Sequence, residues 1–293
     1  MKPPPFQYHD PKTLAEAVQL LGSLDNAKLL AGGQSLMPML NMRFVLPDHV
    51  IDLNKVGSLS GIKEVSGALE IGAMTRQRDL EFSDLVKAKC PLLHEAITHI
   101  GHRQTRNRGT IGGSLCHLDP AAELVSVCAA HDATVTVAGP NGSREVAFAD
   151  FPAGYLTPAI ELNEIVTSIR IPLWPAGHKA AFIEFSRRHG DFAIVSAAAL
   201  LIIDGGKIKR ASVTVGGVAV APVRATEVEQ AITGQAPSSE LFAKVCESCR
   251  SIEALADIHA SADYRQHLAA VLSRRALEKA AGLAENAPWN RKH

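Results

Sequence analysis

The chain has 293 residues, of which 46% are hydrophobic and 20% are charged. This length favours two or three domains over a single core, and the composition is that of an ordinary globular protein. The 30 basic and 30 acidic residues leave no net charge. That balance argues against a general nucleic-acid binder, which needs surplus cations at the phosphates.

The N-terminal part is predicted to contain one helix followed by short strands. Asp10 and Pro11 resemble a helix start, and apolar residues follow at helical spacing from Leu14 to Leu21, just before Gly22. Short strands are predicted over 27–33, 49–54 and 68–74.

The middle of the chain is predicted to be helical first and then β-rich. From Gln77 to Gly101 the apolar spacing is helical, and Pro91 divides the stretch into two helices. A helix is expected over 121–130, a hairpin over 133–148 with turn formers at 140–142, and a strand over 165–172.

The last third follows a boundary at 173–180, where two chain breakers precede a change of pattern. Three strands are expected to form an antiparallel meander, and helices are predicted at about 223–233, 238–251 and 263–282. Strands followed by helices indicate an α+β order.

Two glycine pairs stand out: AGGQS at 31–35 and TIGGS at 110–114. Paired glycines permit unusual backbone angles and let a ligand touch the backbone, and exposed N–H groups in such a turn can hold an anion. Ser35 and Ser114 could each add a hydroxyl donor, so two such turns could clamp a dinucleotide diphosphate. The alternative is an ordinary turn, as we expect for Gly205–Gly206 and Gly216–Gly217. The usual dinucleotide fingerprint and the P-loop are both absent from the sequence.

Three stretches carry a family resemblance: LLAGGQSLMPMLNMRFVLPDHVIDLNKV, HRQTRNRGTIGGSLCHLDPAAEL and FIEFSRRHGDFAIVSAAALL. They resemble the FAD-binding medium subunit of the molybdenum hydroxylases, the family of the carbon monoxide dehydrogenase medium subunit and the xanthine dehydrogenase FAD domain. The resemblance implies an α+β chain. A two-subdomain FAD-binding fold of the vanillyl-alcohol-oxidase (PCMH) type, 1–56 and 57–176, would precede a C-terminal domain, 177–293, with a three-stranded antiparallel sheet and helices.

The resemblance also implies which residues contact FAD. The two glycine segments would hold the pyrophosphate, through Leu29, Leu30, Ala31, Gly32, Gly33, Gln34, Ser35 and Leu36 in the first and Thr110, Ile111, Gly112, Gly113 and Ser114 in the second. Relatives often carry Asn at the position of Ser114, so a side-chain contact there is less well founded than the backbone contacts.

Four further positions follow from the same resemblance, and each has a plain alternative. Glu123 would bind the adenosine side, unless it is a solvated helix charge. Ile100 and Val166 would line the cofactor, unless they are core residues. Phe192 would cover one face of the isoalloxazine, unless it is an ordinary buried strand residue. Ile183 stands where xanthine dehydrogenases carry a lysine, so no lysine role is transferred.

Three other candidate motifs are weaker evidence for function. The basic stretch RQTRNRG (103–109) could face the diphosphate or a partner subunit, or be a solvated loop. His117 and Asp119 lack the further ligands that zinc needs, so no metal site is expected. Cys246 and Cys249 form a lone Cys-x-x-Cys pair within a predicted helix, and the four-cysteine pattern of an iron–sulfur cluster is missing.

The implied function is an oxidoreductase subunit with no catalytic side chain of its own. It would carry FAD and pass electrons from iron–sulfur clusters to an external acceptor. The molybdenum cofactor would lie on a large partner subunit and two [2Fe-2S] clusters on a small one, in a dimer of heterotrimers. The alternative is a self-contained flavin oxidase or dehydrogenase acting on its own organic substrate. A scaffold that has lost FAD is a third possibility.

The sequence also bears on where the protein resides. The longest apolar run, 192–203, is too short to span a bilayer, and the five cysteines show no disulfide-like spacing. We expect a cytoplasmic protein without a membrane span. The sequence leaves open the electron acceptor and the substrate of the complex: carbon monoxide, a nitrogen heterocycle, a purine or another compound.

Overall fold

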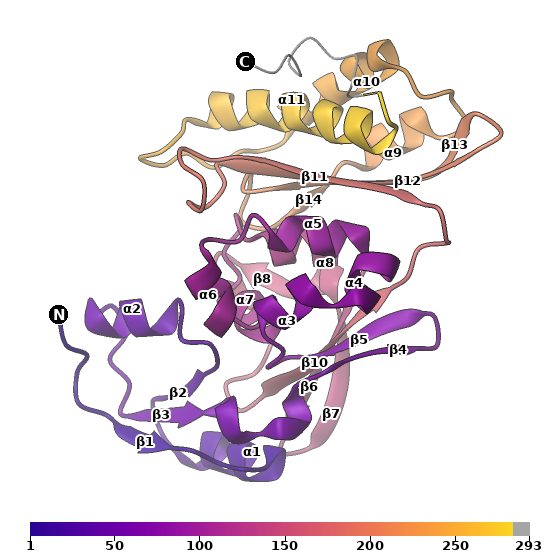
Figure 1. Ribbon diagram of the computed structural model, residues 1–293. Coiled ribbons are helices and arrows are strands. Elements are labelled where there is room, and N and C mark those ends of the chain that lie inside the picture. Colours follow the sequence, from indigo (N-terminus) through magenta and orange to yellow (C-terminus); the bar gives the residue numbers. More distant parts are fainter. Residues whose placement is uncertain (284–293) are drawn as a thin grey trace. The chain divides into compact units, whose positions relative to one another are not determined.

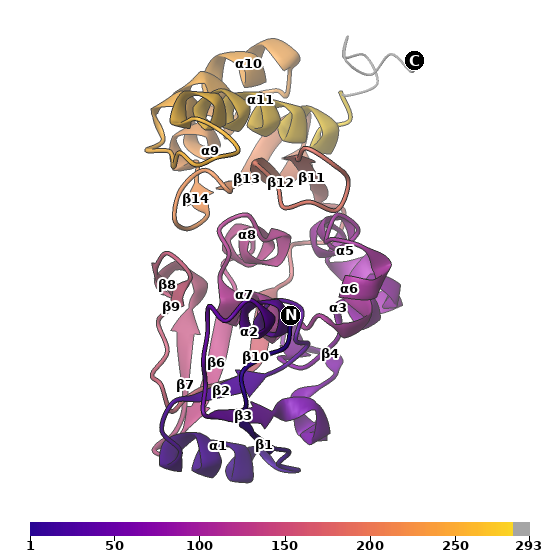
Figure 2. The ribbon, with the colours of Figure 1, turned by 90° about the vertical axis from the view of Figure 1, so that its left-hand side faces the viewer.

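The computed structural model describes residues 1–283 and divides them into two compact units (Figures 1 and 2). Unit 1 comprises residues 1–82, 102–118 and 132–172. Unit 2 comprises residues 83–101, 119–131 and 173 onward. The units are interleaved along the chain, so the boundaries expected after residues 56 and 176 stay a prediction about sequence domains.

The first sheet of unit 1 has three parallel strands in the order β1-β3-β2. The strands are β1 (Gln7–His9), β2 (Ala27–Leu30) and β3 (His49–Asp52), and the helices that accompany them are α1 (Leu14–Ser23) and α2 (Leu36–Asn41). Thr13, not Asp10, caps α1, because its side chain and that of Glu16 form a reciprocal capping box. The helix continues one residue past Gly22, to Ser23.

The second sheet of unit 1 is antiparallel, with five strands in the order β4-β5-β10-β6-β7. Its strands are β4 (Ile62–Val65), β5 (Ala68–Gly72), β6 (Thr134–Gly139), β7 (Gly142–Ala147) and β10 (Ile165–Pro172). The β6–β7 pair is the predicted hairpin. The unit also contains α3 (Gln77–Phe82), α6 (Arg103–Arg108), α7 (Ile111–His117), β8 (Pro152–Gly154) and β9 (Thr157–Pro158).

Unit 2 is built on an antiparallel sheet in the order β11-β12-β13-β14. The three long strands, β11 (Lys179–Phe185), β12 (Val195–Asp204) and β13 (Lys207–Gly216), form the predicted meander. The two-residue strand β14 (Val223–Arg224) adds to its edge where we expected a helix to begin. The antiparallel meander and the α+β fold class are therefore confirmed.

Helices cover both faces of this sheet (Figure 1). One face packs against α5 (Pro91–Ile97) and α8 (Glu123–Ala130), with α4 (Asp84–Lys89) beside α5. The other face packs against α9 (Thr226–Ile232) and α11 (Ala262–Ala280), with α10 (Ser239–Val245) beside them. The helical stretch expected from 77 to 101 is thus three short helices, because Ser83 caps α4 in addition to the break at Pro91.

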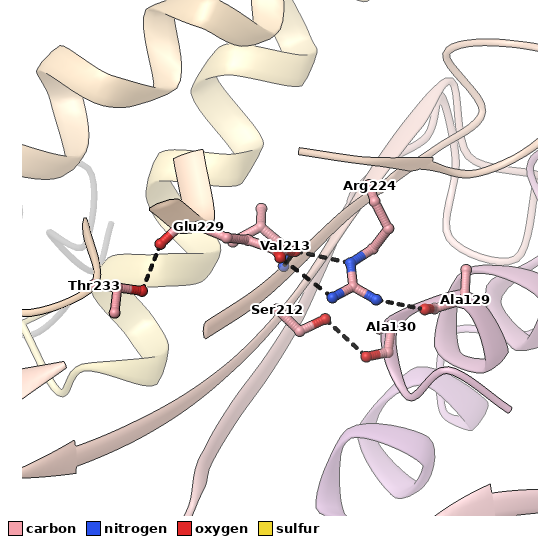
Figure 3. A network of polar contacts seen from close by, with 7 residues as sticks. All are labelled: Ala129, Ala130, Ser212, Val213, Arg224, Glu229 and Thr233. Carbon is pink, nitrogen blue, oxygen red and sulfur yellow. Dashed lines mark hydrogen bonds and ion pairs between the residues drawn. The ribbon is translucent and has the colours of Figure 1, made fainter. Parts of the chain in front are cut away.

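Polar contacts fasten α8 to the sheet (Figure 3). Arg224 donates from Nη1 to the carbonyl of Ala129 at 3.1 Å, and the Ser212 hydroxyl donates to the carbonyl of Ala130 at 2.7 Å. Both acceptors are carbonyls of the last turn of α8, which lack partners within the helix. Gly216 is not an ordinary turn residue, because it ends β13 and a Cβ there would lie 2.2 Å from the Ser126 hydroxyl.

None of the helices in residues 1–283 is both long enough and apolar enough to cross a membrane.

Candidate functional site

The first glycine segment is a tight loop between β2 and α2. Gly33 has a φ of +75°, which disfavours any side chain. Within residues 1–283, the amide N–H groups of Gly32, Gly33, Gln34 and Ser35 have no hydrogen-bond acceptor. Four N–H donors on one loop form the kind of cluster that can bind an anion.

The second glycine segment is not a loop but the start of helix α7. The Thr110 side chain caps this helix by accepting from the Gly113 N–H at 3.0 Å. The Ile111 and Gly112 N–H groups donate to the carbonyls of Thr75 and Ala73. Our expectation of exposed N–H groups here is therefore wrong, because the helix cap and the neighbouring 73–75 backbone already accept from them.

The glycines of the second segment serve close packing. A Cβ on Gly112 would lie 2.6 Å from the Ala73 Cβ, and one on Gly113 would lie 2.8 Å from the Thr110 hydroxyl oxygen. Contacts under 3.0 Å require something to move, so this helix start tolerates no side chain at Gly112 without a shift of backbone. Ser114 is half-buried in the first turn of α7, and its own N–H donates to the Thr110 carbonyl.

The structure brings the two segments into direct contact. A Cβ on Gly32 would lie 2.3 Å from the carbonyl oxygen of Arg108 and 2.8 Å from the Cα of Gly109. The Ala31 Cβ lies 3.4 Å from the position that a Cβ on Gly113 would take. The N–H cluster of the first segment and the glycine-rich start of α7 therefore lie side by side.

Two side chains that the sequence analysis missed support this junction. The Asn54 side-chain amide donates to the Ala31 carbonyl at 3.0 Å. Arg76 donates to the Oδ1 atom of Asn54 and to the carbonyl of Arg108. No motif marks either residue in the sequence, and only the pairing of 73–77 with 109–112 brings Arg76 here.

The remaining unit 1 candidates lie beside these segments in sequence or in the second sheet. Leu29, Leu30 and Leu36 are half-buried at the ends of β2 and α2, and Gln34 donates from Nε2 to the Gly32 carbonyl at 3.3 Å. Val166 is buried in β10 beside an irregularity in its pairing with β6. The stretch 103–109 is not a loop: it forms helix α6, in which Arg106 pairs with Glu81 at 2.8 Å.

Three candidates belong to unit 2. Ile100 is buried after α5. Glu123 is buried in the first turn of α8, so it is not a solvated helix charge. Phe192 is 58% exposed in the loop before β12, so it is not a buried strand residue. Each of the latter two findings removes the plain alternative to a role in binding.

The environment of Glu123 favours its neutral form. Burial raises the pKa of this carboxyl from its ordinary value of 4.5 to about 8, and the nearby carboxylates of Glu184 and Asp119 act in the same direction. The Glu184 side chain is itself buried, with an Oε1 atom 3.4 Å from Nδ1 of His99 and an Oε2 atom that has no hydrogen-bond partner within residues 1–283. At neutral pH Glu123 can therefore donate a hydrogen bond to a ligand.

Cys246 and Cys249 lie in the short 3₁₀ helix Cys246–Ser251, where burial raises the pKa of both thiols. A raised pKa leaves little of the reactive thiolate. Within residues 1–283, no three His, Cys, Asp or Glu side chains are grouped to hold a metal ion.

Comparison with known proteins relates the chain to one family along nearly its whole length. Residues 4–174 match the family described as FAD binding domain in molybdopterin dehydrogenase, and residues 180–280 match the CO dehydrogenase flavoprotein C-terminal domain. The chain is similar to the carbon monoxide dehydrogenase medium chain of Afipia carboxidovorans, with 39% identity over 98% of this chain and 100% of that one. It is similar to the glyceraldehyde dehydrogenase medium chain of Sulfolobus acidocaldarius, with 37% identity over 96% and 100%.

Solved structures agree with this relationship. The carbon monoxide dehydrogenase of Hydrogenophaga pseudoflava contains a chain that superposes with a TM-score of 0.93 at 39% identity, covering 97% of this chain and 99% of that chain. Quinoline 2-oxidoreductase of Pseudomonas putida 86 gives the same TM-score at 35% identity and the same coverage. The protein is therefore an oxidoreductase subunit and belongs to the family of FAD-binding medium subunits of the molybdenum hydroxylases.

Proposed function

We propose that this chain is the electron-transfer subunit of a molybdenum hydroxylase complex. It would receive electrons from iron–sulfur clusters on a partner subunit and deliver them, by means of FAD, to an external acceptor. The observation that carries this proposal is the junction of the two glycine segments, where four N–H donors without an acceptor in residues 1–283 lie beside a glycine-rich helix start.

The residues at the junction fit a dinucleotide diphosphate. Gly32, Gly33, Gln34 and Ser35 offer the N–H donors, and the missing side chains at Gly112 and Gly113 let the helix start pack closely beside this loop. The second segment differs from the first, because its N–H groups at 111–114 are already hydrogen-bonded. It would contribute a closely packed helix start whose conformation is fixed by the Thr110 cap.

Outside the junction, we propose three kinds of contact with FAD. Val166 and Ile100 would offer apolar surface, and Phe192 an aromatic face that is free to stack. Glu123 would donate a hydrogen bond, because its carboxyl is protonated at neutral pH. Bound FAD would supply the redox chemistry, while these residues orient it and limit the access of water. No side chain of this chain is required as an acid, base or nucleophile.

We propose two partners: a large subunit with the molybdenum cofactor and a small subunit with two [2Fe-2S] clusters, in a dimer of heterotrimers. This rests on the family, in which two of the relatives described above are named medium chains, and on the lack of a four-cysteine pattern in the sequence. We also propose a cytoplasmic location, because all five cysteines are free thiols.

Glycine substitution tests the proposed function. Gly33→Val forces a branched side chain into a φ of +75°, and Gly113→Val meets the Thr110 hydroxyl, so both should abolish FAD binding. The measurement is FAD released per chain from the purified complex. Gly57→Val is the matched control, because a Cβ there meets nothing within 4 Å and φ is not in the left-handed region.

Two results would contradict the proposal. One is an intact native complex that contains no FAD. The other is turnover of an organic substrate with oxygen by the isolated chain, which would favour a self-contained oxidase. Circular dichroism of the valine variants should show unit 2 still folded, because neither position belongs to it.

A further inference from the structure

Arg76 connects the backbones of the two glycine segments. Its guanidinium donates one hydrogen bond to the Arg108 carbonyl and another to the Asn54 side chain. Asn54 in turn donates to the Ala31 carbonyl at 3.0 Å, and its own N–H donates to Asp52 Oδ1 at 2.8 Å. The Arg76 guanidinium thus links the first segment, through Asn54, to Arg108, which lies two residues before the second segment.

Two positive charges, those of Arg76 and Arg108, lie near each other without a carboxylate paired to either within residues 1–283. Arg76 is half-buried. Burial and the neighbouring Arg108 charge both lower the pKa of Arg76, and the carboxylates of Asp79 and Asp52 offset only part of this. Two guanidinium groups held together without a counter-ion are unfavourable unless an anion joins them.

The place where these charges lie is also where the free donors lie. The carbonyl of Arg108 that Arg76 holds faces Gly32, whose N–H begins the cluster of four. Cationic side chains and backbone N–H groups thus converge on the same loop. A diphosphate carries negative charge that both could meet at once.

We propose that Arg76 is a positioning residue for the FAD diphosphate: it fixes the spacing of the two glycine segments and, together with Arg108, supplies positive charge opposite the phosphates. This inference rests on the proposed function. It adds a residue that follows β5, outside both glycine motifs, to the binding site.

The test uses the full chain from which FAD has been removed. FAD and ADP are titrated into wild type, Arg76→Gln, Arg76→Lys and the control Arg78→Gln. Arg78 is a good control because it lies two residues away, on the same segment, where it donates to Asn107 and stacks over Phe82.

We expect Arg76→Gln to weaken the binding of both FAD and ADP by roughly 10- to 100-fold, the range for losing a hydrogen bond to a charged group. Adenosine, which has no phosphate, should bind the variant and wild type alike. The affinity of wild type for ADP should fall more steeply with salt than that of Arg76→Gln, because one charge interaction is gone. A purely structural role for Arg76 would leave this salt dependence unchanged. Arg78→Gln should stay within about twofold of wild type, because surface changes are small.

Equal FAD affinities for Arg76→Gln and Arg78→Gln would overturn the inference. Arg76→Lys keeps the charge but loses the two-point contact, so we expect it to bind FAD more weakly than wild type. A lysine variant as tight as wild type would contradict the positioning role, and this variant decides the matter if the glutamine variant does not fold. Failure of the wild-type chain to bind FAD would instead count against the proposed function.

Discussion

The carboxyl group of Glu123 illustrates how burial can favour the neutral form of an acidic residue. It lies in the first turn of α8, where a helix N-terminus favours a negative charge, yet its pKa is raised to about 8. Desolvation is the largest cause, and the carboxylates of Glu184 and Asp119 add to it. Burial therefore outweighs the helix dipole at this position.

This shift predicts a pH dependence of stability. Between about pH 4.5 and 8 the folded chain keeps the Glu123 proton that the unfolded chain loses. The folded state then binds more protons, so the contribution of Glu123 to the free energy of unfolding falls as pH rises, by at most ~1.4 kcal/mol per pH unit. We expect Glu123→Gln to remove this loss.

The measurement is urea unfolding of wild type and variant at pH 5.5 and pH 7.5, values chosen inside the window of about pH 4.5 to 8. Relative to wild type, Glu123→Gln should gain stability at the higher pH. Glu240→Gln is the control, because Glu240 also lies in the first turn of a helix, α10, but is exposed. An identical pH difference in wild type and Glu123→Gln would contradict the raised pKa.

At the residue scale, the sequence predicted which segments form the candidate site better than it predicted the burial and contacts of single side chains. The glycine segments could be recognised because their residue types are restricted by backbone geometry, as at Gly33 with its positive φ. The burial of Glu123, the exposure of Phe192 and the contacts of Arg76 depend on segments far apart in the chain. A local pattern contains no information about such neighbours.

At the scale of elements, α8 depends on a network that comes from the C-terminal sheet (Figure 3). Glu229 Oε1 accepts from the Val213 N–H at 2.7 Å and from Arg224 Nε at 2.8 Å, which orients Arg224 toward Ala129. The Glu229 carboxylate in α9 thus orients the arginine that donates to the last turn of α8, although α8 and α9 pack on opposite faces of the sheet.

Removing this carboxylate should loosen unit 2. We expect Glu229→Ala to lower the free energy of unfolding by about 1–3 kcal/mol, because the Val213 N–H and the Arg224 guanidinium both lose a charged partner. Chemical denaturation measures the loss. Glu227→Ala, an exposed change in the first turn of the same helix, should have little effect, and equal losses in the two variants would refute the network's role.

Element types followed the pattern of apolar and turn residues well. The β6–β7 hairpin appears where alternation and turn residues place it, and the strands β11 to β13 appear at the predicted apolar segments. The start of α7 was missed because the pattern TIGGS reads as a turn, whereas the Thr110 cap makes it a helix N-terminus. Strand β14 is too short for any periodicity to reveal it.

At the scale of the whole molecule, the helices that cover one face of the unit 2 sheet come from earlier in the chain than its strands. Helices α5 and α8 contribute buried apolar residues against β11, β12 and β13, although they precede these strands by many residues. A fragment beginning at residue 173 lacks both helices.

We expect that fragment, residues 173–293, to expose the apolar face of its sheet. It should bind a hydrophobic dye and unfold gradually. The full chain should not bind the dye and should unfold in a sharp transition. Dye fluorescence and thermal unfolding monitored by circular dichroism provide the comparison. A fragment that unfolds as cooperatively as the full chain would show that α5 and α8 are dispensable.

The interleaving of the two units also has a consequence for how the protein is made. Unit 1 has all its segments once residue 172 has been synthesised, whereas unit 2 already contains 83–101 and 119–131 but still lacks every strand of its sheet. Domains that finish first during synthesis can fold first. Helices α5 and α8 therefore emerge with apolar faces that have no sheet to cover, and the growing chain must carry them until β11 to β13 arrive.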